Sequence, residues 1–286
     1  MKRLSDPRLM LITAMTIFGT IGLLVRNIPL PSGEIALYRA VLATLLIVGF
    51  LLVTRQKIPV KAIKKSLPLL LVSGAAMGFN WILLFESYRY TTISVATLSY
   101  YFAPVLVILL CPVLFREKMT GKQWLCFVMS TIGIVLITGV GDTGGASDHF
   151  RGIVLALSAA SLYAAVILLN KFIRDVQGIQ RTLIQFLAAI VVLLPYTAFT
   201  GGFHLTSLNP VGWCNLLIVG LIHTGVTYCL YFSSLKALPG QKAAILSYID
   251  PLVAVLVSVI ILQEPMNLWQ MIGGAMILGF TLYNEL

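Results

Sequence analysis

The sequence predicts an all-α integral membrane protein with ten transmembrane helices in two inverted five-helix repeats. Three observations lead to this prediction. The 286-residue chain is 59% hydrophobic and only 10% charged, which no soluble domain of this length matches. Its apolar stretches are long enough to cross a bilayer. The two halves of the chain also resemble each other, and an odd number of spans in each half would turn the second half upside down.

The internal repeat is seen when the sequence is compared with itself at an offset of 147 residues. This offset aligns Gly78 with Gly225, Phe85 with Phe232, Ser87 with Ser234, Tyr101 with Tyr248, Pro104 with Pro251, Glu117 with Glu264 and Gln123 with Gln270. One ungapped offset relates all these pairs, so chance similarity between apolar segments explains them poorly. We predict a first repeat over residues 1–140, an extracytoplasmic linker over 141–151 and a second repeat over 152–286. Inverted repeats are typical of secondary transporters.

The ten spans are predicted in order along the chain. They cover residues 9–26, 33–53, 67–88, 93–115, 123–140, 152–172, 182–200, 211–235, 241–262 and 267–284. A helix needs about 20 residues to cross the hydrocarbon core. Together the spans use nearly the whole chain and leave no room for a soluble catalytic domain. The first span belongs to the repeat and is too long for a cleaved signal peptide.

The net charge of +10 follows the predicted topology. With a cytoplasmic N-terminus, sixteen of the twenty Lys and Arg residues lie on the inner side, including a basic segment from Arg55 to Lys65. Arg26, Arg89 and Arg151 lie on outer loops. This asymmetry predicts a multi-pass protein of the cell inner (plasma) membrane with both termini in the cytoplasm. Anionic membrane lipid is a sufficient partner for the basic side, and no nucleic acid is needed.

The glycines indicate packing rather than a cofactor site. Gly139, Gly141 and Gly144 match the dinucleotide pattern GxGxxG, but they lack the strand and helix of a soluble βαβ unit. No GxxxxGK[ST] loop is present, so we expect neither a cofactor nor an ATP-driven pump. Gly74 and Gly78 form a GxxxG in the third span, and Gly273, Gly274 and Gly279 enrich the tenth. Small residues let helices approach closely in lipid; a homodimer contact through them is the alternative.

Asp250 is the candidate of greatest interest. It lies about nine residues into the ninth span, ~14 Å deep at 1.5 Å per residue, where an acid costs at least ~2.5–3.5 kcal/mol. Pro251 follows it and frees the carbonyl of Ser247, and Pro104 does the same to Tyr100 in the fourth span. Two proline-interrupted helices at matching positions predict a central binding site. The alternative is that the prolines only kink the helices and Asp250 caps the break.

Polar and aromatic side chains at mid-span extend this candidate site. They are Asn80, Trp81, Tyr100, Tyr101, Tyr163, His223, Tyr228 and Tyr248. Membrane aromatics usually lie at span ends, so central ones suit a cavity that stacks on a small organic molecule. Aromatic faces around an acid also suit an amine. His223 is either a proton carrier or a packed hydrogen-bonding residue. Asp250 could exchange protons against substrate or bind an amine directly. No metal site is predicted.

Four charged residues predict an outer gate. Arg39 lies inside the second span, and Glu34 lies nearer its outer end. Glu86 and Arg89 are three residues apart, so they can pair along one face of the third span. We expect Arg39 to pair with Glu34 or Glu86 and close the outer mouth of the cavity. The alternative is that these long side chains extend to the membrane interface.

The chain resembles the EamA family of the drug/metabolite transporter superfamily over its whole length. The resemblance rests on the two five-span repeats, the Tyr-Arg-Ala run ending at Ala40, and the paired motifs YYFAPVLVILL and SYIDPLVAVLV, each followed by a Glu (Glu117, Glu264). Many members carry Gly before that Glu, where this chain has Arg116 and Gln263. The resemblance implies a central cavity bordered by spans 1 to 4 and 6 to 9, with spans 5 and 10 peripheral. It also implies ATP-independent transport of small metabolites.

These observations lead to one main function hypothesis and two alternatives. The main one is a secondary active transporter that exports small amino acids, amines or related metabolites by alternating access, with proton coupling as an option. The first alternative is an importer of a cationic nutrient such as choline. A phosphate carrier fits less well, since the mid-membrane charge is negative. The second alternative, an intramembrane enzyme, lacks an HExxH, a DDxxD or a Ser–His–Asp set.

Overall fold

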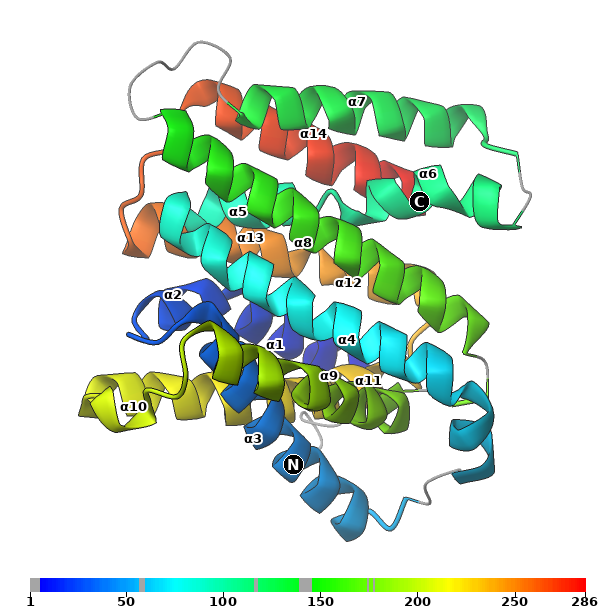
Figure 1. The fold of residues 1–286 in the computed structure, drawn as a ribbon. Coiled ribbons are helices and arrows are strands. Elements are labelled where there is room, and N and C mark those ends of the chain that lie inside the picture. The colour runs from blue at the N-terminus through cyan, green and yellow to red at the C-terminus, as the bar shows by residue number, and fades with distance from the viewer. Residues whose placement is uncertain (1–5, 57–59, 116–117, 139–145, 174, 177) are drawn as a thin grey trace.

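A computed structural model describes residues 6–56, 60–115, 118–138, 146–173, 175–176 and 178–286, which fold into helices without any strand (Figure 1). The first half holds α1 (Pro7–Gly19), α2 (Ile21–Arg26), α3 (Ser32–Val53), α4 (Val60–Tyr90), α5 (Ile93–Tyr100), α6 (Ala103–Phe115) and α7 (Gly121–Ile137). The second half holds α8 (Ala146–Phe172), α9 (Gly178–Thr200), the 3₁₀ turn η2 (Leu205–Ser207), α10 (Pro210–Leu217), the π-helical η3 (Ile218–Val226), α11 (Thr227–Leu235), α12 (Gly240–Ser247), α13 (Ile249–Leu256), the π-helical η4 (Val257–Ile261) and α14 (Leu268–Glu285).

The helices begin at local signals in the sequence. The side chain of Asp6 accepts a hydrogen bond from the backbone N–H of Arg8, and a proline opens α1 directly after it. Asn209 caps α10 in the same way, again followed by proline. Such side chains satisfy N–H groups that have no partner within the helix. Proline suits the first helical position, where its missing N–H costs nothing.

The internal repeat extends to the helix boundaries and caps. The offset of 147 residues maps α5 onto α12 residue for residue. It also maps the capping box of α7, formed by Thr120 and Gln123, onto that of α14, formed by Asn267 and Gln270. The two halves therefore share local structure as well as sequence. The inverted orientation of the halves stays a prediction.

Among the described residues, eight helical segments are long and apolar enough to cross a membrane. They are Pro7–Arg26, Ser32–Val53, Val60–Tyr90, Ile93–Phe115, Asp148–Phe172, Gly178–Thr200, Pro210–Leu235 and Lys242–Ile261. The chain is thus a multi-pass membrane protein. The helices of predicted spans 5 and 10 are weaker candidates, because α7 has only 17 residues and α14 is less apolar. The count of ten spans stays a prediction.

The α7 and α14 helices lie side by side at one edge of the bundle (Figure 1). A Cβ atom added to Gly133 would meet the side chain of Ile277 at 2.9 Å, and one added to Gly273 would meet that of Ile137 at 3.0 Å. The two glycines therefore allow the helices to touch along their backbones. This contact gives the glycine of the last helix a packing role inside one chain.

The remaining helices form the centre of the molecule. Helix α4 packs against α8 and α9, α3 packs against α9 and η3, and α1 packs against α11 and α13. Elements of the two halves are thus neighbours throughout, and the largest apolar cluster combines Trp81 and Phe85 with Phe186. This arrangement encloses a space between the halves.

Two predicted connections are partly helical. Helix α4 begins at Val60, so Lys61 and Lys65 extend it instead of forming a loop, because Ala62 and Ile63 pack against Ile173 and Val176. Helix α8 begins within the predicted linker, at residue 146. Residues 57–59 and 139–145, on which the rest of these two predictions falls, lie outside the described residues. Arg116 and Glu117 also lie outside them.

Candidate functional site

A cavity of about 550 Å³ lies between the two halves. Its walls include all but one of the mid-span candidates and one of the two prolines: Asn80, Trp81, Tyr100, Tyr101, Pro104, Tyr163, Tyr228, Ser247, Tyr248 and Asp250. Helix α7 contributes no lining residue, and α14 contributes only Glu285. Cavities of this size typically hold small organic molecules.

Asp250 lies where the two broken helices meet. Helix α12 ends at Ser247 and α13 begins at Ile249, while α5 ends at Tyr100 and α6 begins at Ala103. The hydroxyl of Tyr101, in the break of the first half, donates a hydrogen bond of 2.6 Å to Oδ2 of Asp250. One hydrogen bond thus joins the breaks of the two halves inside the cavity.

Aromatic rings and amides form the wall around this acid. The rings of Tyr100 and Tyr163 stack with centroids 5.4 Å apart. The Tyr100 hydroxyl donates to Oδ1 of Asn80 at 3.4 Å, and the Asn80 amide donates to the carbonyl of Ala159 at 2.6 Å. These contacts hold flat π surfaces and a polar edge in place, as a site for a partly apolar ligand with a polar group requires.

Arg39 does not join the predicted outer gate. Its side chain lines the central cavity and is only 5% exposed. Its Nε donates to Oγ1 of Thr224 at 2.7 Å, and its guanidinium lies 4.5 Å from the centre of the Trp81 ring. No ion pair joins it to Glu34 or Glu86, which are both described residues, because tertiary packing turns its side chain toward η3 and the cavity.

The other residues of the predicted outer gate have other partners, and the predicted ion pair of Glu86 with Arg89 is present. The carboxylate of Glu34 accepts a hydrogen bond of 2.8 Å from the backbone N–H of His204. It also lies 2.6 Å from the ring Nδ1 of the same histidine. Glu86 accepts a hydrogen bond of 2.6 Å from Ser32 and lies 3.7 Å from Nε of Arg89. Neither acid nor Arg89 lines the central cavity.

His223 also lies outside the cavity lining. It belongs to the π-helical η3 and is 5% exposed. Its Nε2 lies 2.9 Å from the hydroxyl of Thr20, at the break between α1 and α2. This contact corresponds to the packed, hydrogen-bonding alternative for His223. Pro251 is buried beside the cavity without lining it.

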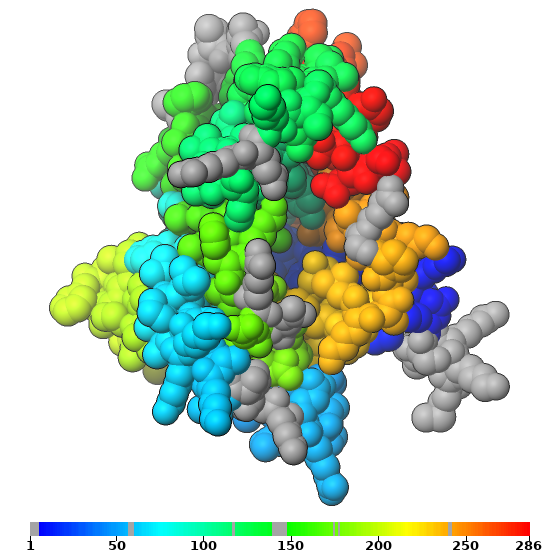
Figure 2. Space-filling view, turned by 90° about the vertical axis from the view of Figure 1, so that its right-hand side faces the viewer, coloured from blue at the N-terminus to red at the C-terminus, as the bar shows by residue number. Residues whose placement is uncertain are grey.

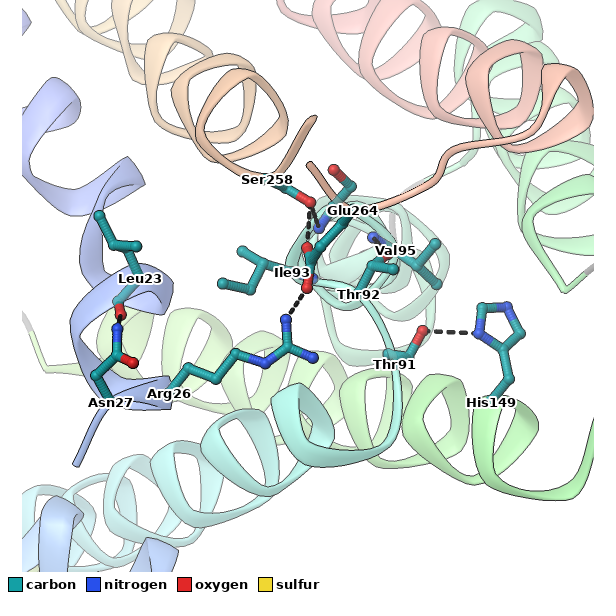
Figure 3. A network of polar contacts seen from close by, with 11 residues as sticks. Leu23, Arg26, Asn27, Thr91, Thr92, Ile93, Val95, His149, Ser258 and Glu264 are labelled. Carbon is teal, nitrogen blue, oxygen red and sulfur yellow. Dashed lines mark hydrogen bonds and ion pairs between the residues drawn. The ribbon is translucent and has the colours of Figure 1, made fainter. Parts of the chain in front are cut away.

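A polar network lies at the start of α5, beside the cavity-lining residue Ile93 (Figure 3). Glu264 pairs with Arg26 at the end of α2 and accepts a hydrogen bond from Ser258 in η4. It also accepts one of 2.9 Å from the N–H of Ile93, the first residue of α5. We call Arg26, Ile93, Ser258 and Glu264 the Glu264 network. A carboxylate is favoured at a helix N-terminus, where N–H groups lack partners.

Sequence reasoning noted Glu264 as a repeated motif residue and placed Arg26 on an outer loop, yet it missed their contact. The repeat was a usable signal, because the motif puts Glu264 at the end of the broken ninth span. Nothing local to Arg26 indicates its partner. The network joins the three elements α2, α5 and η4, and its member Ile93 lines the cavity.

Away from the Glu264 network, the cavity opens to the surface. Figure 2 looks onto this face and shows it hollowed between the green of α8 and the yellow-orange of α12. Arg181 in the first turn of α9 and Glu285 at the end of α14 line the cavity here. Nη1 of Arg181 lies 3.5 Å from the carbonyl of Asn170. Sequence reasoning assigned no site role to Arg181, since it reads as one more inner basic residue.

Apolar helices of membrane-spanning length around a cavity of ligand size define a multi-pass membrane protein that can hold a small molecule between two repeats. Comparison with known proteins gives the family: the model of the EamA-like transporter family matches residues 8–139 and again residues 150–284. The chain belongs to this family of the drug/metabolite transporter superfamily. It is a transporter of that type.

Individual relatives agree with this assignment. The uncharacterized transporter YxxF of Bacillus subtilis (strain 168) is 32% identical over 277 residues, which cover 96% of this chain and 88% of the relative. An uncharacterized transporter of Archaeoglobus fulgidus is 33% identical over 193 residues, 67% of either chain. A protein of known crystal structure superposes with a TM-score of 0.66 at 15% identity, over 97% of this chain and 95% of the other. That last likeness concerns the fold alone.

Proposed function

We propose that the protein is a secondary active transporter that exports a small metabolite carrying an amino group, such as an amino acid or an amine. It works by alternating access, and Asp250 is the group that binds the cation or the coupling proton. The observation that supports this most is the position of Asp250, in a 550 Å³ cavity and at the break of α12 and α13. An acid inside a membrane protein usually serves transport.

The surroundings of Asp250 suit a cationic group. The Tyr101 hydroxyl occupies one of its carboxylate oxygens, which leaves the other oxygen for a ligand. The stacked rings of Tyr100 and Tyr163 line the same cavity. Aromatic faces attract ammonium groups and add to the charge of an acid.

The two ends of the cavity support alternating access. We infer that the Glu264 network closes the end of the cavity near Ile93, whereas the end that carries Arg181 and Glu285 is open. The positive-inside rule places the Arg181 end in the cytoplasm. The described conformation is then inward-facing, and release to the outside requires the Glu264 network to part. Loading from the cytoplasm is what an exporter needs.

The test begins with the purified full-length protein in detergent. A screen of thermal stability against alanine, leucine, phenylalanine, putrescine and choline identifies a ligand, because saturation at 100 times the dissociation constant stabilises a fold by ~2.7 kcal/mol. Stabilisation by choline alone would favour the importer alternative. Transport of the identified ligand is then measured in proteoliposomes between pH 5 and 8.

Asp250→Asn keeps the shape of the side chain and removes its charge. We expect normal folding and about tenfold weaker binding or more, since a hydrogen bond to a charged group is worth ~1.5–3 kcal/mol. The matched control is Asp175→Asn, which removes a half-exposed carboxylate that pairs with Lys65 at the surface. Wild-type transport by Asp250→Asn across this pH range contradicts the proposal.

A further inference from the structure

The position of Arg39 bears on which ligands the cavity accepts, and this inference rests on the proposed function. Arg39 is a buried cation without a matching acid. No acidic side chain among the described residues forms an ion pair with it, and its one hydrogen bond runs from Nε to Thr224. Arginine has five N–H donors, so both terminal nitrogens of the Arg39 guanidinium stay available to donate hydrogen bonds to a ligand. Because the side chain lines the cavity, a ligand can reach them.

The protein holds this guanidinium in a fixed orientation. Thr224 donates its own hydroxyl proton to the carbonyl of Val219, five residues earlier, at 2.8 Å. Its oxygen is thereby left to accept from Arg39. This spacing of five follows from the π-helical form of η3, a local structure often found at functional sites. Trp81 and Phe85 cover the guanidinium with ring centroids at 4.5 and 5.4 Å. A flat, supported guanidinium suits bidentate recognition of a carboxylate.

The charges of the cavity lie at two depths. The charged lining residues among those described are Arg39, Arg181, Asp250 and Glu285. Arg181 and Glu285 lie at the open end, whereas Arg39 in α3 and Asp250 in the first turn of α13 lie near the middle of their membrane spans. Tyr88 and Tyr228 line the same cavity as both deep charges. The deep cavity therefore presents one positive pole from the first half and one negative pole from the second.

Simple ions fit these two poles poorly. A plain amine would meet Asp250 but add a second positive charge to the space beside Arg39. A plain carboxylate would do the reverse beside Asp250. Burying a charge without a counter-charge is costly in a low-dielectric site. A molecule with both groups would neutralise both poles at once.

We propose that Arg39 binds the carboxylate of a zwitterionic substrate whose ammonium group faces Asp250. Arg39 is then the residue that separates amino acids from the corresponding amines. The aromatic wall contacts the apolar part of the substrate. Choline and simple amines bind weakly at this site, because they leave Arg39 without a partner.

The experiment compares ligand pairs that differ only in the carboxylate: leucine with 3-methylbutylamine, and phenylalanine with phenethylamine. Dissociation constants are measured on the purified full-length protein. Wild type should prefer the amino acid of each pair by about 10- to 100-fold, the value of a charge-assisted contact. Arg39→Gln should remove this preference, with the amine bound as well as the amino acid or better.

Two further variants test the same contact of Arg39, and a third is a control. Arg39→Lys retains the charge but loses the fork, so we expect an intermediate preference, and it replaces Arg39→Gln if that variant does not fold. Thr224→Val removes the acceptor that orients Arg39 and should lower the preference. Arg8→Gln changes an exposed arginine at the start of α1 and should bind both ligands as wild type does.

The outcomes separate the two proposals. If Asp250→Asn weakens binding but wild type binds each amine as tightly as its amino acid, Arg39 has a structural role only and this inference is wrong. If neither these ligands nor alanine or putrescine bind wild type, or if Asp250→Asn binds all of them normally, the proposed function fails and this inference fails with it.

Discussion

Single side chains acquire their roles here from one or two polar contacts. Asp250 and Tyr101 come from different halves, and their hydrogen bond of 2.6 Å is the direct polar link between the two helix breaks. Arg39 depends on Thr224 in the same way. In the low-dielectric interior of a helix bundle, each such contact decides whether a charged group faces a ligand or a protein partner.

A substitution that removes one hydroxyl group tests the role of Tyr101. Tyr101→Phe removes the hydroxyl that donates to Asp250 and keeps the ring. We expect weaker ligand binding, by about tenfold or more, and a changed pH profile of transport, since a hydrogen bond to a charged group is worth ~1.5–3 kcal/mol. Tyr163→Phe is the control, because it keeps the ring stacked on Tyr100. Equal pH profiles for the two variants would remove Tyr101 from the mechanism.

Helices in this bundle approach one another where glycine allows it. A Cβ atom added to Gly19, the last residue of α1, would lie 2.5 Å from the carbonyl oxygen of Asp250 and 2.7 Å from Cβ of Val253. Helix α1 therefore touches the backbone of α13 directly at the candidate site. The packing of these two elements sets the position of the acid.

Gly19→Ala should push α1 and α13 apart. Overpacking of this kind costs ~1–3 kcal/mol, so we expect a lower midpoint of thermal unfolding and weaker ligand binding. Gly49→Ala is a matched control in α3, where an added Cβ meets nothing within 4 Å. There alanine should be neutral or stabilise the helix by ~0.5–1 kcal/mol. A Gly19→Ala protein as stable as the Gly49→Ala protein would contradict the close contact.

The whole molecule is organised around a cavity that opens to the surface. We propose that the Glu264 network closes its other end through α2, α5 and η4 (Figure 3). These elements come from both halves, so parting them is a motion of one half against the other. Such relative motion is how repeat-built transporters change access.

Glu264→Gln should weaken this closure and increase the outward-open population. The measurement is labelling of Ile21→Cys, at the cavity wall, by an impermeant thiol reagent in intact cells that express a variant without the four native cysteines. We expect faster labelling in the Glu264→Gln background. Glu34→Gln is the control, since Glu34 pairs with His204 away from the cavity. Faster labelling with Glu34→Gln alone would contradict closure by the Glu264 network. It would favour the outer gate that the sequence predicted.

The predicted topology belongs to the same scale. Lys61 lies at the start of α4, on the proposed cytoplasmic side, and Phe203 follows α9 on the outer side. In the cysteine-free variant, the impermeant reagent should label Phe203→Cys in intact cells and should label Lys61→Cys only after permeabilisation. The opposite pattern would reverse the topology and with it the proposed direction of transport.

The sequence alone determined the class of protein and part of the cavity wall. The long apolar stretches, the repeat at an offset of 147 residues and the two prolines are local or periodic features of the sequence. They can therefore be recognised without coordinates. Asp250 stood out for the same reason, because an acid at mid-span is costly wherever its neighbours lie. Ten of the candidate residues and prolines predicted on these grounds line one cavity.

Only the tertiary structure decided which polar groups meet. Arg39 was predicted beside Glu34 or Glu86 but lies against Thr224, which is 185 residues away in sequence. Glu34 pairs with His204, 170 residues away. Arg26 and Glu264 come from opposite ends of the chain. A long flexible side chain can satisfy its charge with any partner in reach, and which partner is in reach depends on how the helices of the two halves pack together.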